Sequence, residues 1–136
     1  MPFVLDNSVV MAWCFEDEDT VYADRVLELL NTETALAPAV WPLEVANALV
    51  VSERRERLRT ADALRFVELL SGLPITVDGI TLAQALRSVL DVARMYGLTS
   101  YDAAYLELAM RAGLPVATLD ERLSDAARKA GIPLVE

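Results

Sequence analysis

The chain has 136 residues, 54% of them hydrophobic, which is enough for one domain over residues 1–136 but not for two cores of ordinary size. It contains no histidine, one cysteine and one lysine, which excludes Ser-His and Cys-His nucleophilic sites, histidine acid–base catalysis and the usual zinc sites. The formal net charge of −9 argues against a nucleic-acid partner, because phosphate binding normally needs a basic face. The remaining chemistry relies on carboxylates, hydroxyls, arginines and metal ions, and ligation by oxygen alone favours Mg²⁺ or Mn²⁺.

The chain starts with MPFVLD, which is not a basic and then apolar leader, and no apolar run is long enough to cross a membrane. We therefore expect a cytoplasmic protein with no membrane partner. In a reducing compartment the single cysteine, Cys14, stays free, and its apolar neighbours predict a small buried side chain.

Short apolar runs alternate with helical patterns along the whole chain. The runs that predict strands are residues 3–5, 36–38, 75–77, 116–119 and 134–135. Helical spacing of apolar residues is clearest over residues 23–30 and 82–93. Strands separated by helices imply crossover connections and therefore a parallel sheet. Such sheets bind ligands at the carboxyl ends of their strands, which is where the chemistry is expected.

Local signals indicate where these helices begin and end. Pro42 suits the first turn of a helix, and Thr60 and Ser100 are placed as N-caps. Glycines follow three helical runs and are expected to end them: Gly97, Gly113 and Gly131.

Four acids stand at or near the predicted junctions between strand and helix: Asp6, Glu44, Asp102 and Asp120. Three of them are the only charged residues in apolar stretches, over residues 1–15, 34–52 and 95–106. Taken singly, Asp6 and Asp120 could be N-caps, and Glu44 and Asp102 could be first-turn acids favoured by the helix dipole. Taken together, converging carboxylates in apolar surroundings require a cation, and two divalent ions would return positive charge where a phosphate would lie.

Hydroxyl side chains lie two residues from two of these acids, at Ser8 and Thr118. They could orient metal ligands or a bound water, and ordinary turn hydrogen bonding is an equally good interpretation.

These residues resemble a known family. The ordered segments VLDNSV, PLEVANAL, LTSYDAAYLELA and ATLDERL resemble the PIN domain, and more narrowly the VapC toxins of bacterial toxin–antitoxin pairs. The resemblance covers nearly the whole chain, and its most specific part is TSYDAAYLELA followed by ATLD. All four acids match by position.

The resemblance implies an α/β fold with three α/β/α layers and a parallel sheet of four or five strands. It also implies Mg²⁺-dependent hydrolysis of RNA phosphodiester bonds, with Mn²⁺ as a substitute, a homodimer, and an antitoxin protein that blocks the site. Asp6 and Asp102 would bind a principal Mg²⁺, while Glu44 and Asp120 complete the acidic pocket or share a second ion. Water would be the nucleophile, so that no histidine pair is needed.

Two alternatives remain open. One is a phosphoryl-transfer domain such as a receiver or a haloacid-dehalogenase-like phosphatase. That phosphatase needs a second acid where this chain has Ser8, and both need a lysine near the phosphate, whereas Lys129 lies deep in the last helix. The other is a catalytically inert PIN-like binding module, which the intact set of acids disfavours.

Two charged clusters have no role in this motif. Four arginines, Arg54, Arg55, Arg57 and Arg59, are interleaved with two glutamates, which favours a solvated helix end over a phosphate or partner contact. The acidic run over residues 16–19 is interpreted as a solvated loop.

Overall fold

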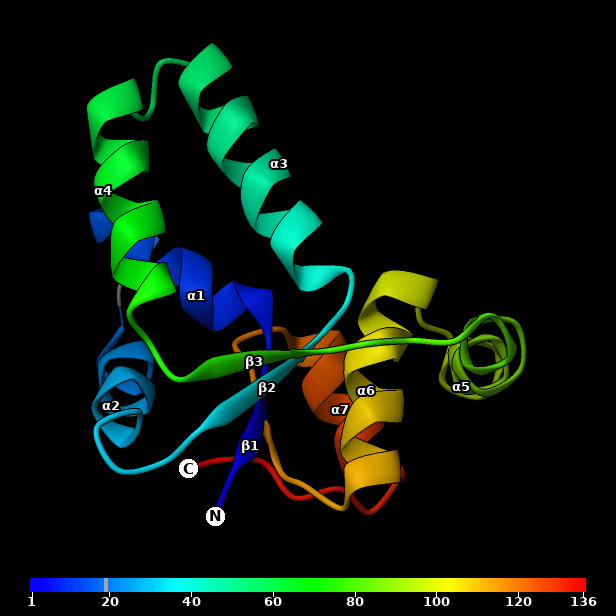
Figure 1. Ribbon diagram of the computed structural model, residues 1–136. Coiled ribbons are helices and arrows are strands. Elements are labelled where there is room, and N and C mark those ends of the chain that lie inside the picture. The colour runs from blue at the N-terminus through cyan, green and yellow to red at the C-terminus, as the bar shows by residue number, and fades with distance from the viewer. Residues whose placement is uncertain (19) are drawn as a thin grey trace.

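The computed structural model describes residues 1–18 and 20–136. Its centre is a four-stranded sheet in the order β3-β2-β1-β4, and all neighbouring strands are parallel (Figure 1). The strands are β1 (Phe3–Leu5), β2 (Ala35–Pro38), β3 (Ile75–Asp78) and β4 (Val116–Ala117). This confirms the expected α/β fold with a parallel sheet.

Helices flank the sheet on both sides (Figure 1). They are α1 (Asn7–Cys14), α2 (Val21–Leu29), α3 (Trp41–Arg54), α4 (Thr60–Ser71), α5 (Leu90–Tyr96), α6 (Ser100–Ala112) and α7 (Glu121–Lys129). The helix α6 contacts β1, β2 and β4 and also α5 and α7, whereas α1 contacts α2 and α3. Because β1 is central and both faces of the sheet are covered, all three residues of β1 are apolar and at most 2% exposed.

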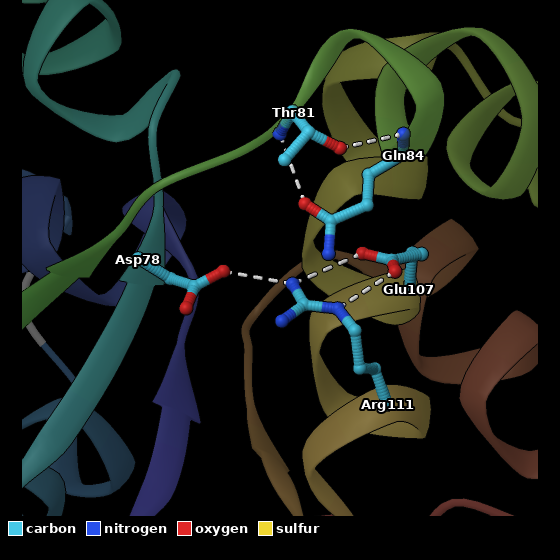
Figure 2. A network of polar contacts seen from close by, with 5 residues as sticks. All are labelled: Asp78, Thr81, Gln84, Glu107 and Arg111. Carbon is cyan, nitrogen blue, oxygen red and sulfur yellow. Dashed lines mark hydrogen bonds and ion pairs between the residues drawn. The ribbon is translucent and has the colours of Figure 1, made fainter.

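A polar network fastens the carboxyl end of β3 to α6, and a separate pair of hydrogen bonds closes the turn after β3 (Figure 2). Arg111 on α6 donates to Asp78 at 2.7 Å and to Glu107, one turn earlier, at 2.9 Å. Glu107 is only 5% exposed, so this ion pair compensates a buried charge. Thr81 and Gln84 bond to each other reciprocally at 2.9 and 3.1 Å, as in a capping box. The network holds in place the helix that carries Asp102.

The ends of several elements differ from the prediction. β4 ends at Ala117 rather than at residue 119, because the Thr118 hydroxyl accepts the Asp120 N–H and turns the chain away from the sheet. The expected strand over 134–135 is a single bridge from Leu134 to Val116. Thr60 and Ser100 are the first helical residues rather than N-caps..

Other local predictions are confirmed. Gly97 and Gly113 cap α5 and α6 with φ of 64° and 66°, a left-handed conformation that glycine adopts without strain. Gly131 follows α7 with φ of 73°, and Pro42 lies in the first turn of α3.

The helix expected over residues 82–93 contains a π-helical stretch, η2 (Gln84–Val89), directly before α5. Its apolar spacing predicted the helix but not the burial, since Leu82 and Leu86 are 76% and 61% exposed. None of the helices in the described part of the chain has the length and apolar run that a membrane span requires.

Two expectations near the end of α1 need correction. Cys14 is only partly buried, and this burial raises the pKa of its thiol. In the acidic run, residues 16–18 form a 3₁₀ turn, η1 (Glu16–Glu18), rather than an irregular loop, but Asp17 and Glu18 are exposed as expected, and Asp19 lies outside the described residues. Asp17 pairs with Arg57 at 3.2 Å, and the Arg57 guanidinium also stacks 4.7 Å from the centre of the Phe15 ring. One of the four clustered arginines therefore ties the turn after α3 to the turn after α1.

The turn between α3 and α4 contains a strained residue. Glu56 has φ of 59°, which is the left-handed position usually occupied by glycine after a helix, and the Arg57 N–H closes the turn on the Ser52 carbonyl at 2.9 Å. A left-handed L-residue costs about 1–2 kcal/mol, whereas glycine costs about 0.5–1 kcal/mol through the flexibility it adds to the unfolded chain.

We expect Glu56→Gly to raise the melting temperature by a few degrees in a thermal denaturation scan, because the strain is worth more than the added flexibility. Glu56→Ala is the matched control, since it removes the same side chain but keeps the strain. If both variants melt at the same temperature, the backbone at this position is not strained.

Candidate active site: four carboxylates at the edge of the sheet

Asp6 lies at the point where β1 becomes α1, and it is the most buried of the four acids, at 5% exposure. Its carboxylate is held by three donors, all directed at the same oxygen, Oδ2. The Ser8 hydroxyl donates at 2.5 Å, the Thr118 hydroxyl at 2.8 Å and the Ser8 backbone N–H at 3.4 Å. None of these three donors bonds to the other oxygen, Oδ1.

The two hydroxyls are oriented by the chain that follows β4. The Ser8 Oγ accepts the Leu119 N–H at 2.9 Å, and the Thr118 Oγ1 accepts the Asp120 N–H at 3.0 Å. Each hydroxyl thus accepts from a backbone amide and gives its own proton to Asp6. Both of them therefore join the end of β4 to the end of β1 through the Asp6 carboxylate.

Asp120 begins α7 as its N-cap. Its Oδ1 accepts the N–H groups of Arg122 at 2.8 Å and Leu123 at 3.2 Å. The capping role anticipated for Asp6 and Asp120 is thus real, and it occupies one carboxylate oxygen of each residue while leaving the other free of it.

Glu44 is partly buried in the first turn of α3, after β2. Its Oε1 accepts the hydroxyl of Tyr105 at 2.5 Å. Tyr105 is fully buried on α6, three residues after Asp102, and burial together with the Glu44 carboxylate raises the pKa of its phenol. Sequence analysis missed Tyr105, although its spacing from Asp102 places both side chains on one side of the same helix.

The pKa directions show that these acids lie within electrostatic reach of one another. Burial raises the pKa of Asp6, and the charge of Asp102 adds to this, while the Ser8 and Thr118 hydrogen bonds oppose it. Burial also raises the pKa of Glu44, helped by the charges of Asp6 and Asp102. The pKa of Asp102 is raised by burial and then by the charge of Asp120. Each of Asp6, Glu44 and Asp102 is thus repelled by the charge of at least one other acid of the four.

The four acids lie at the same edge of the sheet, but they do not surround a single point. Within residues 1–18 and 20–136, no three acidic or cysteine side chains are close enough to chelate a metal ion. Hydrogen bonds to the scaffold hold one oxygen each of Asp6, Glu44 and Asp120.

The donor set nevertheless fits a hard divalent cation. It consists of carboxylate oxygens, partly desolvated, with no nitrogen or sulfur ligand among the matched residues. Among the described residues, two buried side-chain polar atoms lack a hydrogen-bond partner: the Oδ1 of Asn7, which follows Asp6 in the sequence, and the Nε1 of Trp41, which precedes Glu44 by three residues. Unpaired buried polar atoms are rare in proteins and often accompany an ion, a water or a functional site.

Comparisons with known proteins agree with this geometry. The PIN domain family matches residues 3–129. This chain belongs to the PIN-domain family. Ribonuclease VapC3 of Pyrobaculum aerophilum is 31% identical over 125 residues, which cover 92% of this chain and 94% of that protein. In chain order the four acids follow β1, β2, the turn before α6, and β4.

Solved structures support the same fold. PAE2754 from Pyrobaculum aerophilum has a TM-score of 0.69 and 28% identity, covering 93% of this PIN domain chain and 79% of that chain. VapBC2 from Rickettsia felis, bound to a DNA fragment from their promoter, also has a TM-score of 0.69 at 12% identity, covering 99% and 98%. FitAcB from Neisseria gonorrhoeae has a TM-score of 0.66 at 16% identity, covering 100% and 97%.

The repulsion among the acids makes a prediction about stability. We expect Asp102→Asn to melt at a higher temperature than the parent in a chelator near pH 7.5. It gives up a helix-dipole interaction of about 0.3–1 kcal/mol, but relieves the repulsion with Asp6, Glu44 and Asp120. Because the raised pKa values make the folded parent take up protons as pH falls, the gain should shrink toward pH 5.

Asp91→Asn is the matched control for this experiment, because Asp91 is an exposed first-turn acid of α5 that pairs with Arg94 at 4.0 Å. It removes the same charge without relieving repulsion at the site, and we expect no gain. An Asp102→Asn variant that melts several degrees below the parent would show that the acids do not repel one another.

Proposed function

We propose that this PIN domain is a metal-dependent endoribonuclease that hydrolyses RNA phosphodiester bonds with Mg²⁺, or Mn²⁺ in its place. The single observation that carries the proposal is the placement of Asp6, Glu44, Asp102 and Asp120 at the carboxyl edge of the sheet, where burial and then neighbouring carboxylates raise the pKa of Asp6, Glu44 and Asp102. The name of the relative, Ribonuclease VapC3, supports RNA as the substrate.

Each residue has a defined task in this proposal. Asp6 and Asp102 hold the principal ion, and Glu44 and Asp120 complete the acidic pocket. When bound, the ion lowers the pKa of a water and stabilises negative charge on the phosphate and on the leaving oxygen. Ser8 and Thr118 fix the Asp6 carboxylate, and Tyr105 fixes Glu44, so that these ligands are held before substrate arrives.

The proposal also includes a protein partner that binds this acidic pocket. We expect an antitoxin protein that blocks the site, because an arginine can pair with two carboxylates at once and displace the ion. An apolar groove of about 410 Å³ lies between α3 and α4, lined by residues that include Trp41, Val45, Leu49 and Leu70. It would accept the apolar face of such a partner. A homodimer remains a prediction of the resemblance, and a cytoplasmic location remains a prediction from the sequence.

The test is cleavage of total RNA by the purified protein. We expect cleavage with Mg²⁺ or Mn²⁺, none in excess chelator and none with Ca²⁺, which binds ligands more loosely. Asp6→Asn should lose cleavage, whereas the matched surface variant Asp91→Asn, which changes an exposed acid paired with Arg94, should retain it.

Cleavage that persists in excess chelator would overturn the metal dependence. An absence of cleavage with every metal, in a protein that still binds RNA, would favour the inert binding module.

A further inference from the structure

The helix α7 carries positively charged side chains that form no recorded ion pair within the described residues. Among its three cations, Arg128 pairs with Asp125 at 3.1 Å. The structure records no ion pair for the exposed Arg122 or Lys129 within the described residues.

Arg122 and Lys129 line the same cleft. They are seven residues apart, so they lie on one side of α7 and about 10.5 Å apart along its axis. The cleft, of about 180 Å³, is closed on its other side by the end of α5 and the turn after it, with Tyr96, Gly97 and Leu98. Asp125 also lines it, but its charge is compensated by Arg128. The unpaired charge of the cleft is therefore positive.

This cleft adjoins the carboxylates. Arg122 follows Asp120 by two residues, and its charge lowers the pKa of Asp102 against the effect of burial. A cation in the first turn of a helix is opposed by the helix dipole, so Arg122 does not stabilise α7 from that position. Its side chain is instead suited to a negative group located next to the acids.

We propose that the cleft between α7 and the end of α5 binds the RNA backbone beside the bond that is cut. Arg122 contacts the phosphate nearest the carboxylates, and Lys129 contacts a phosphate farther along the strand. The ring of Tyr96 offers a surface on which a base can stack. Four carboxylates repel a polyanion, and a cation placed between them and the flanking strand offsets that repulsion. This inference rests on the proposed function and adds the path of its substrate.

The first experiment measures binding without cleavage. Fluorescence anisotropy of a labelled single-stranded RNA is recorded against salt concentration in an Asp6→Asn background. Each phosphate contact contributes about 0.7 to the slope of log affinity against log salt. We expect Arg122→Gln and Lys129→Gln each to weaken binding and to reduce that slope by about 0.7.

The matched controls are Arg87→Gln and Arg55→Gln. Both residues are exposed arginines outside the cleft, with no ion pair recorded in the part of the chain that the structure describes. Arg87 tests the effect of net charge alone, and Arg55 tests the arginine cluster at the end of α3. Slopes that fall for Arg55→Gln but not for the cleft variants would overturn the proposal by placing the strand on α3.

The second experiment uses substrate length. In the parent background with Mg²⁺, Lys129→Gln should raise KM for a long single-stranded RNA but leave the cleavage of a dinucleotide unchanged, because the dinucleotide has no distant phosphate. Arg122→Gln should impair both substrates, and Arg122→Lys should restore part of the loss.

The two proposals fail in different ways. If the parent neither cleaves nor binds RNA, the proposed function is wrong. If the parent cleaves RNA and the cleft variants match Arg87→Gln in slope and in KM, the function stands and this cleft does not carry the strand. Cleft variants that cleave normally but lose a protein partner would assign the cleft to that partner instead.

Discussion

The rest of the site depends on one constraint: the carboxylate of Asp6 is buried but has to stay charged if it is to bind a metal ion. Asp6 lies at the end of the central strand, where desolvation raises its pKa and works against the charged form. Two hydroxyls and one amide, all bonded to one oxygen, restore part of the lost solvation. Because the hydroxyls come from α1 and from the turn after β4, the same bonds fix the relative position of two segments that are 112 residues apart.

In three of the four acids, the two carboxylate oxygens have different surroundings. One oxygen of Asp6, Glu44 and Asp120 is bonded to the scaffold, through hydroxyls, a phenol and helix N–H groups respectively. The other oxygen is left out of these bonds. Capping and metal binding, which appear as alternatives from the sequence, are therefore compatible in the same residue.

Much of this could be predicted from the sequence, because it depends on local patterns. The apolar run of β1, the glycines after α5 and α6, and the isolation of Asp6, Glu44 and Asp102 in apolar stretches are all visible in the chain. The bond from Tyr105 to Glu44 and the pairing of Arg57 with Asp17 could not be predicted, since they join segments 61 and 40 residues apart. The exposure of Leu82 and Leu86 was also missed, because helical spacing does not tell whether a partner surface exists.

The central claim is that these carboxylates hold a divalent cation, and calorimetric titration with Mn²⁺ in the absence of RNA tests it most directly. The parent and Asp91→Asn, which changes an exposed acid, should bind Mn²⁺ alike, whereas Asp6→Asn should lose the binding. If Asp6→Asn binds Mn²⁺ as tightly as the parent, the cation lies elsewhere and the account of this site is wrong.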